Sequence, residues 1–228
     1  MHRSASCGRV GEETRVQWPC ATVTPNSDSH RWRDRVRSGT VMSGHRVCPW
    51  WLGYLLASPL RRLAYRPDTI LAPHVRTGMT VLEPGPGMGF FTVELARMVG
   101  PLGRVVAVDV QSKMLDALRR RLSKAGLAER VDVRLAKPDS MGVAGLSGMV
   151  DFVLAFAVVH ELPSVDCFFL EANQVLKLEG HLLLAEPAGH VSDALFEAER
   201  AAAAKAGLVT VQEPVIRRSR AALLQKRA

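Results

Sequence analysis

Three glycines, Gly85, Gly87 and Gly89, stand at alternate positions in the segment EPGPGMG, which begins at Glu83. Glycines let a backbone turn tightly and approach a ligand with no side chain in between. Asp109 follows 24 residues after Gly85 (109 − 85), at the end of the next apolar segment. A carboxylate at that place can accept hydrogen bonds from both hydroxyls of a ribose. The spacing therefore predicts a nucleoside site.

The spacing of the glycines bears on which nucleoside fits. A nicotinamide dinucleotide site has the third glycine one position later, as GxGxxG, and binds a pyrophosphate at the start of the helix. The carboxylate of Glu83 would repel a pyrophosphate a few ångströms away, but it would attract a ligand that carries an ammonium and a sulfonium. S-adenosylmethionine is such a ligand, so we expect it as the cofactor and keep a nicotinamide oxidoreductase as the weaker alternative.

Ionisable side chains also follow two later apolar segments. His160 and Glu161 come after one of them, and Glu186 and His190 come after the next. His160 is the candidate general base because an imidazole titrates near neutral pH, although it could instead only shape the pocket. Glu186 and His190 could polarise a substrate or anchor the following loop. The set has no HExxH spacing and the four cysteines form no CxxC pair, so we expect no metal.

The sequence around these residues alternates between strand and helix patterns. Such alternation implies a mostly parallel sheet that is covered by helices on both faces. Strands are expected at Thr80–Glu83, Arg104–Asp109, Val131–Leu135, Val150–Phe156 and His181–Ala185, followed by a terminal hairpin at about Val209–Gln212 and Ala221–Gln225. Helices are expected from Pro67 to about Val75 and at Phe90–Val99, Lys113–Lys124, Val165–Leu176 and Asp193–Ala206. Ser192 is a candidate N-cap for the last helix, and Gly207 follows its end.

The stretch from about Thr80 to Gly189 resembles the class I S-adenosylmethionine-dependent methyltransferases, particularly the small-molecule branch with a methyltransferase-11-like domain. The resemblance implies an α/β fold, a Rossmann-like, doubly wound, mostly parallel seven-stranded sheet with a C-terminal antiparallel hairpin. It places Glu83 and the three glycines around the methionine part of the cofactor and Asp109 on the ribose.

The same resemblance implies further contacts with the cofactor. Val110 and Met114 would lie against the adenine, Asp139 and Ser140 would meet its amino edge, and Phe156 would form the wall near the transferable methyl group. The segment 176–180, LKLEG, resembles the LKPGG turn of these enzymes.

The acceptor is expected to be a small molecule. Methyltransferases that act on exocyclic amines of nucleic-acid bases resemble one another in a [DN]PP[YF] loop after the fourth strand, which holds the flipped-out base. Here that place reads AFAVVH, from Ala155 to His160, so a nucleic-acid amine is disfavoured. A protein that binds the cofactor without turnover, as a sensor or scaffold, is the second hypothesis.

Composition and charge bound the remaining possibilities. The chain has 228 residues, 47% hydrophobic and 23% charged, with a net charge of +8, which is typical of a globular protein. No apolar run approaches the roughly 20 residues of a membrane span, so we expect a cytoplasmic protein. Residues 1–41 are expected to be a disordered basic leader, and one hypothesis starts the natural chain at Met42. Residues 42–78 are expected to form a helical or lid segment, and 79–228 the cofactor-binding domain.

Overall fold

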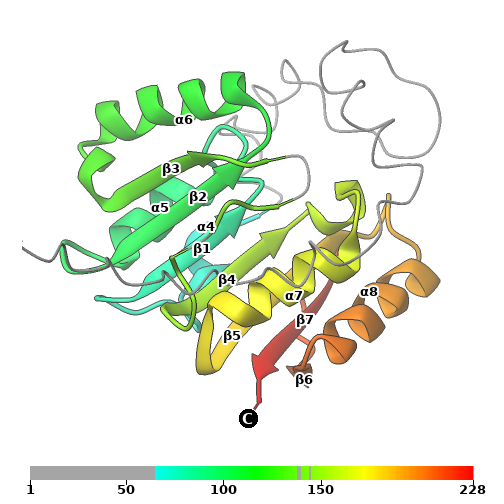
Figure 1. Ribbon diagram of the computed structural model, residues 1–228. Coiled ribbons are helices and arrows are strands. Elements are labelled where there is room, and N and C mark those ends of the chain that lie inside the picture. The colour runs from blue at the N-terminus through cyan, green and yellow to red at the C-terminus, as the bar shows by residue number, and fades with distance from the viewer. Residues whose placement is uncertain (1–64, 138–139, 144, 228) are drawn as a thin grey trace, which may run out of the picture.

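A computed structural model describes residues 65–137, 140–143 and 145–227 of the chain (Figure 1). The predicted leader, residues 1–41, and the predicted lid segment up to residue 64 lie outside the described residues, as does Asp139. The described residues thus comprise the predicted cofactor-binding domain, apart from these gaps, and residues 65–78, which lead into it.

Seven strands form one sheet in the order β3-β2-β1-β4-β5-β7-β6 (Figure 1). The first five are parallel, and β7 pairs antiparallel with both β5 and β6. The strands are β1 Thr80–Pro84, β2 Arg104–Asp109, β3 Val131–Leu135, β4 Val150–Phe156, β5 Leu176–Pro187, β6 Leu208–Gln212 and β7 Ser219–Lys226. The predicted parallel sheet with an antiparallel terminal hairpin is thereby confirmed.

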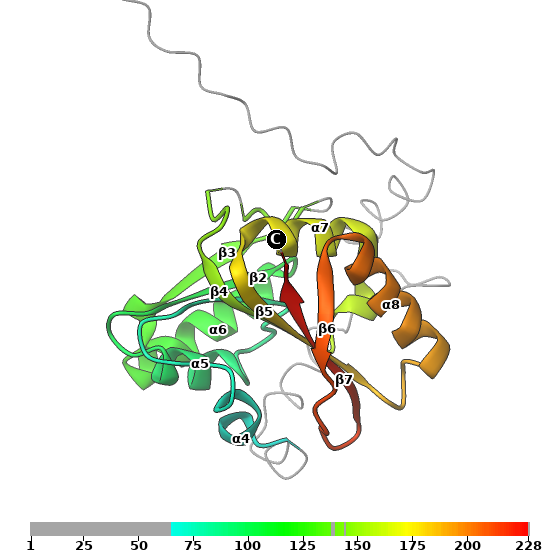
Figure 2. The same ribbon diagram turned by 90° about the horizontal axis from the view of Figure 1, so that it is seen from below.

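Helices cover both faces of this sheet (Figure 2). The elements on one face are α4 Pro67–Leu71, α5 Thr92–Met98 and α6 Ser112–Ala125, and those on the other are α7 Val165–Val175 and α8 Asp193–Lys205. Two short 3-10 turns, η2 Ala128–Arg130 and η3 Val159–Glu161, precede β3 and follow β4. Helices on both faces are what parallel strands require, because each crossover must pass over the sheet.

Each central strand contributes to two hydrophobic cores by alternation of its side chains. In β4, Phe152 and Leu154 pack with α5 and α6, whereas Val153 and Ala155 pack with α7 and α8. Successive side chains of a strand point to opposite faces, so a strand that is buried on both faces must be apolar at nearly every position. This explains the continuous apolar runs of the sequence.

The helices follow the predicted patterns at their faces and ends. Leu115 and Leu118 of α6 are buried, whereas Arg119 is exposed. Ser192 caps α8, since its hydroxyl accepts a hydrogen bond from the Leu195 amide at 3.2 Å, which satisfies one of the free amides of a helix start. Gly207 follows the end of α8 with φ 87°.

Most element boundaries lie within two residues of the prediction, and two differ by more. The first helix ends at Leu71 rather than near residue 75, because Pro73 has no amide hydrogen to continue it. Strand β5 begins at Leu176 rather than at His181, with a shift in its register against β4, and Glu179 takes a left-handed φ of 62°. The segment 176–180, expected as a turn, is thus an irregular part of β5.

Strands β1 and β4 are neighbours although β2 and β3 separate them in the sequence. This is the position at which the strand order reverses, and ligands of such sheets bind there, outside the carboxyl ends of the strands. The glycine turn follows β1 and His160 follows β4. The fold therefore brings the two groups of candidate site residues to one edge of the sheet.

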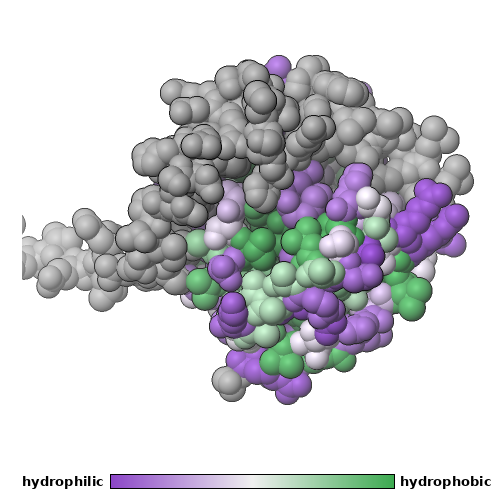
Figure 3. Space-filling view, turned by 90° about the vertical axis from the view of Figure 1, so that its right-hand side faces the viewer, coloured by the Kyte–Doolittle hydropathy of each residue, from purple (hydrophilic) through white to green (hydrophobic). Residues whose placement is uncertain are grey.

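Edge strand β6 exposes apolar side chains, with Val209 and Val211 47% and 40% exposed. On the face drawn in Figure 3, apolar and hydrophilic residues of the described chain are interspersed in small groups. None of the helices in the described ranges is both long and apolar enough to cross a membrane.

Candidate active site

In the glycine turn between β1 and α5, two of the three glycine positions have no room for a Cβ atom, and the third has open space around it. Gly85, Gly87 and Gly89 all have positive φ, at 64°, 54° and 83°. A Cβ on Gly85 would lie 2.6 Å from Val158 Cγ2, and one on Gly89 would collide with the Leu118 side chain. A Cβ on Gly87 would meet nothing within 4 Å. The bare backbone of Gly87 thus offers an open surface on which a ligand can lie.

Asp109, at the end of β2, is tied to this turn. Its Oδ2 accepts a hydrogen bond from the Gly87 amide at 3.3 Å, and its Oδ1 accepts one from the Gln111 amide at 2.9 Å. The Val110 amide also acts on this carboxylate, and a carboxylate has about four lone-pair positions, so Asp109 can still accept from a ligand. The side chain is 8% exposed, and burial raises the pKa of its carboxyl above the ordinary value of 3.8. This arrangement fits two donors on adjacent hydroxyls, as a ribose supplies them.

Glu83 is the second carboxyl at the turn. It is 3% exposed at the tip of β1, where it pairs in register with Ala107 of β2. A carboxylate at this place attracts a cationic group of a ligand more than an anionic one. Glu83 thus lies at the end of β1 that leads into the turn, and Gly87 and Asp109 are joined within that turn.

The other predicted cofactor residues are placed as follows. Met114 of α6 and Phe156 of β4 are buried, and Val110, which follows β2, is half-buried. Ser140 lies in a tight turn after β3, where it forms a bridge with Lys137 and its hydroxyl accepts from the Gly142 amide at 3.0 Å. A hydrogen bond from the Ala136 amide to the Asp109 carbonyl, at 2.9 Å, joins the end of β3 to that of β2.

Aromatic rings gather at the tip of β4. The ring of Phe156 lies 4.5 Å from that of Phe91 and 5.1 Å from that of Tyr65, the latter edge-on. Directly after it, Ala157 has φ 56°, and its amide donates to the Ala185 carbonyl at 2.7 Å. A left-handed non-glycine residue stores strain, and such residues concentrate at functional sites. The aromatic rings and the constrained backbone of Ala157 thus make the tip of β4 a rigid, apolar wall next to η3.

His160 and Glu186 form a close pair. Nδ1 of His160 lies 2.5 Å from Oε2 of Glu186, and the other carboxylate oxygen accepts from the Val159 amide at 2.7 Å. The carboxylate is an acceptor, so Nδ1 carries the hydrogen and Nε2 keeps its lone pair. The hydrogen bond to Glu186 raises the pKa of the imidazole above 6.5, and burial opposes that shift. The pair has the chemistry of an oriented general base.

The side chain of Glu186 is fully buried. Both of its oxygens are engaged by the loop after β4, through the Val159 amide and His160, and not by the following loop that the sequence suggested it might anchor. The ring of His190 lies 6.3 Å from that of His160. Glu161 lies on the other side, with Oε1 3.9 Å from Nε2 of His160.

Glu199 of α8 is a further buried carboxyl, which was not among the site residues predicted from the sequence. This side chain is 1% exposed, and neither of its oxygens has a hydrogen-bond partner among the described residues. Burial and the charge of Glu186 raise its pKa to about 8. The signal was available, since Phe196, Glu199 and Ala203 have the i, i+3, i+7 spacing of one apolar helix face.

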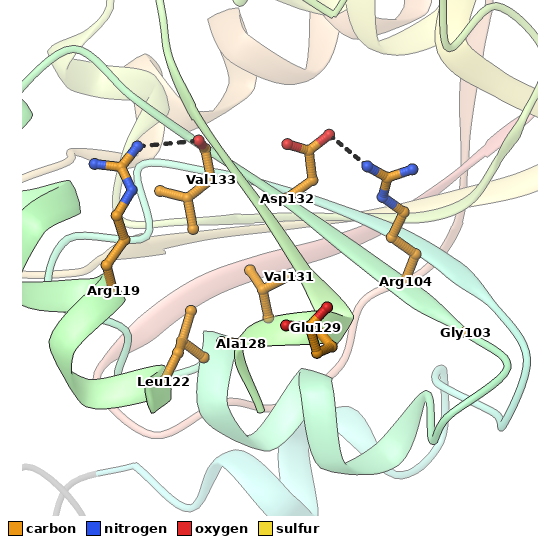
Figure 4. Close-up of a pocket in the computed structure, with 9 residues that line it drawn as sticks. All are labelled: Gly103, Arg104, Arg119, Leu122, Ala128, Glu129, Val131, Asp132 and Val133. Atoms are coloured by element: carbon orange, nitrogen blue, oxygen red, sulfur yellow. Dashed lines mark hydrogen bonds and ion pairs between the residues drawn. The ribbon is translucent and has the colours of Figure 1, made fainter. Parts of the chain in front are cut away.

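A separate hollow lies between α6 and β3, near the beginning of β2 and β3 rather than at their carboxyl ends (Figure 4). Three of its charged groups are engaged within the protein: Arg104 contacts Asp132 at 2.9 Å, and Arg119 donates to the Val133 carbonyl at 3.2 Å (Figure 4). It therefore has none of the features of the glycine turn. Within the ranges that the structure describes, no group of three or more His, Cys, Asp or Glu side chains could hold a metal ion.

Comparison with known proteins agrees with this geometry. The family described as "methyltransferase domain" matches residues 76–219. An arsenite methyltransferase of Halobacterium salinarum is 33% identical over 109 residues, which are 48% of this chain and 27% of that protein. The ubiquinone/menaquinone biosynthesis C-methyltransferase UbiE of Hahella chejuensis is 29% identical over 132 residues, 58% of this chain and 52% of that protein.

Among solved structures, an S-adenosylmethionine-dependent methyltransferase from Aquifex aeolicus superposes with a TM-score of 0.69 at 24% identity, covering 78% of this chain and 98% of that one. Fold and site together define the class as S-adenosylmethionine-dependent methyltransferases with a Rossmann-like sheet. The chain belongs to the methyltransferase domain family, which confirms the resemblance drawn from its sequence. It spans about half or less of the length of these two curated relatives.

Proposed function

We propose that this chain transfers a methyl group from S-adenosylmethionine to a small-molecule acceptor. The observation that carries the proposal is the hydrogen bond from the Gly87 amide to Asp109, which joins the open backbone of the turn to a buried carboxylate. Support also comes from the relatives, since one is named for arsenite and another for ubiquinone and menaquinone.

In this proposal the chain holds the cofactor at three places. Asp109 accepts hydrogen bonds from the ribose hydroxyls, Val110 and Met114 lie against the adenine, and Ser140 and Asp139 are the proposed partners of its amino edge. Glu83 faces the positively charged methionine part across the turn. When bound there, the cofactor supplies a methyl group that its sulfonium has already activated toward a nucleophile, so the protein mainly provides positioning.

His160 then acts as the base for an acceptor that must lose a proton. Its Nδ1 is held by Glu186, so Nε2 is the atom that takes the proton from the acceptor as the lone pair of the acceptor forms its bond to carbon. Glu186 holds the ring in orientation and stabilises the imidazolium that results. Glu186 is in this sense a positioning residue rather than a group that touches the acceptor.

The acceptor is proposed to be partly apolar. Phe156, Phe91 and Tyr65 form an aromatic group at the tip of β4, the strand end that precedes His160. Aromatic side chains at such a place bury large apolar areas of a ligand. Tyr65 belongs to the segment that the sequence suggested as a cover for the acceptor.

Incubation with a methyl-labelled cofactor and a fractionated small-molecule extract tests the proposal. We expect label in a small molecule and stoichiometric release of S-adenosylhomocysteine, both lost in His160→Gln while cofactor binding remains. Cofactor binding without label transfer to any fraction would instead identify a binding protein without turnover.

A further inference from the structure

The segment of residues 140–143, which follows β3, lies beside the proposed ribose site. Strand β3 pairs in parallel with β2 up to Asp109, and the Ala136 amide donates to the Asp109 carbonyl at 2.9 Å. The next residue, Lys137, exchanges backbone hydrogen bonds with Ser140, at 3.0 and 3.4 Å. A series of backbone hydrogen bonds thus leads from the carboxylate proposed for the ribose to Ser140, the residue proposed for the amino edge of the adenine.

Glu171 of α7 holds the same segment from another side. Its Oε2 accepts a hydrogen bond from the Met141 amide at 2.8 Å, although 30 residues separate the two in the sequence. Glu171 is 2% exposed, and the Met141 side chain is buried as well. If this acceptor were lost, water could not easily take its place, and the buried amide would be left without a partner.

The helix face that carries Glu171 is otherwise apolar. Its other buried residues are Phe168, Phe169, Ala172 and Val175. A carboxyl among such side chains is costly to bury unless it forms hydrogen bonds, and packing alone would be served by an apolar residue. The contact with the Met141 amide therefore gives Glu171 a use that the packing of α7 does not explain.

Ser140 is held in a defined orientation within this segment. Its hydroxyl oxygen accepts a hydrogen bond from the Gly142 amide at 3.0 Å, and Gly142 has φ 67°, a left-handed conformation that glycine adopts readily. A hydroxyl has one donor hydrogen and two lone pairs, so Ser140 can also accept from the amino group of an adenine. The place of this hydroxyl depends on the backbone of residues 140–142, which Glu171 holds at its middle residue.

We propose that Glu171 is a positioning residue for recognition of the adenine of S-adenosylmethionine. Through the Met141 amide it fixes the backbone that presents Ser140 to the amino edge of the base, without touching the cofactor itself. The proposal deepens the proposed function and rests on it for the presence of the cofactor. Loss of the acceptor at residue 171 then reduces the preference for a base that carries an amino group, beyond any general loss of stability.

Calorimetric titration with two ligands tests this proposal. One is S-adenosylhomocysteine, and the other is its analogue whose base lacks the exocyclic amino group. The ratio of the two dissociation constants measures what the amino group contributes to binding. We expect the wild type to prefer the ligand with the amino group, and Glu171→Met to reduce this preference by roughly threefold or more, about the worth of one hydrogen bond. A general weakening of the fold would lower both affinities and leave the ratio unchanged.

Three further variants separate the acceptor from the bulk of the side chain. Glu171→Ala removes the same acceptor without adding bulk, and it should reduce the ratio in the same way if methionine cannot be accommodated. Glu171→Gln keeps a carbonyl oxygen at the same place and should retain the wild-type ratio. Gln174→Met is the matched control on the same helix, since its side-chain oxygen has no hydrogen-bond partner among the described residues, and it should also leave the ratio unchanged.

An equal ratio in the wild type, Glu171→Met and Glu171→Ala would overturn the proposal, as would a wild type that binds both ligands equally well. If the wild type bound neither ligand, the proposed function would fall as well. Hydrogen exchange of the Met141 amide in the ligand-free protein tests the anchor by itself. It should be slow in the wild type and in Glu171→Gln and faster in Glu171→Met, and unchanged exchange would overturn the proposal whether or not the cofactor binds.

Discussion

The imidazole of His160 and the carboxylate of Glu186 lie 2.5 Å apart, although 26 residues separate them in the sequence. The contact joins the loop after β4 to the end of β5, two neighbouring parallel strands. It fixes which nitrogen of the neutral ring carries the hydrogen, and in the proposed function it gives the base a defined direction.

Replacing Glu186 by glutamine should lower the pKa of His160, because the hydrogen bond to a charged acceptor is the main cause of its upward shift. Removing one partner of a buried pair also lowers the free energy of unfolding, by roughly 3–5 kcal/mol. Urea unfolding at several pH values measures the second effect.

The sign of the pH dependence follows from the direction of that shift. Since the folded-state pKa of His160 is raised, its stabilising contribution is fully present below about 6.5, the ordinary value, and is lost as the pH rises through the folded-state pKa. The difference in unfolding free energy between the wild type and Glu186→Gln should therefore shrink toward alkaline pH. A difference that grew with pH would contradict the assignment.

Gly87→Ala should weaken cofactor binding more than it weakens the fold. A Cβ at this position meets no protein atom within 4 Å but points into the proposed ligand surface, and the positive φ costs about 1–2 kcal/mol. Gly78→Ala is the matched control, since Gly78 has φ 86° and equally free surroundings before β1, away from the turn. Thermal unfolding and cofactor titration of both variants separate the strain from the ligand clash.

Equal cofactor affinity in the two alanine variants would exclude Gly87 from the binding surface. Gly85→Ala, by contrast, should destabilise the fold itself, because its Cβ would overlap with Val158.

Histidines at the opposite end of the sheet from the glycine turn should lower the free energy of unfolding at acid pH. His74 stacks on Phe152, with ring centroids 5.5 Å apart. Burial lowers the pKa of His74, and nearby His181 and Arg76 lower it further. At His74 the unfolded chain therefore binds more protons than the folded one below about pH 6.5, so this residue lowers the free energy of unfolding as the pH drops, opposite in sign to His160.

His74→Gln should flatten that dependence. Chemical denaturation between pH 7 and pH 5 is the measurement, and a slope unchanged by the substitution would show that His74 is not among its causes.

Much of this molecule could be predicted from its sequence, and the exceptions have identifiable causes. The strands were visible because a strand buried on both faces is apolar throughout, as Val150–Phe156 is. The turn was visible because Gly85 and Gly89 have conformations and contacts that only glycine tolerates. These features are local in the chain.

What could not be predicted depends on contacts between distant segments. The early start of β5 at Leu176 is fixed by pairing with Val150, which overrides the turn-like sequence that follows. The burial of Glu199 depends on how α8 packs on the sheet, and the orientation of His160 depends on the neighbouring ends of β4 and β5. Asp109 was found early because its spacing from the glycines is itself a sequence pattern.

Calorimetry with S-adenosylmethionine tests the central claim most directly, on the wild type, Asp109→Asn and a control, Asp132→Asn. Asp132 is a carboxylate on β3 that binds Arg104 and Arg134 at the separate hollow. The account predicts binding by the wild type and Asp132→Asn, and affinity at least roughly tenfold lower for Asp109→Asn, since charged hydrogen bonds of about 1.5–3 kcal/mol each are lost. Failure of the wild type to bind this nucleoside, or undiminished binding by Asp109→Asn, would contradict it.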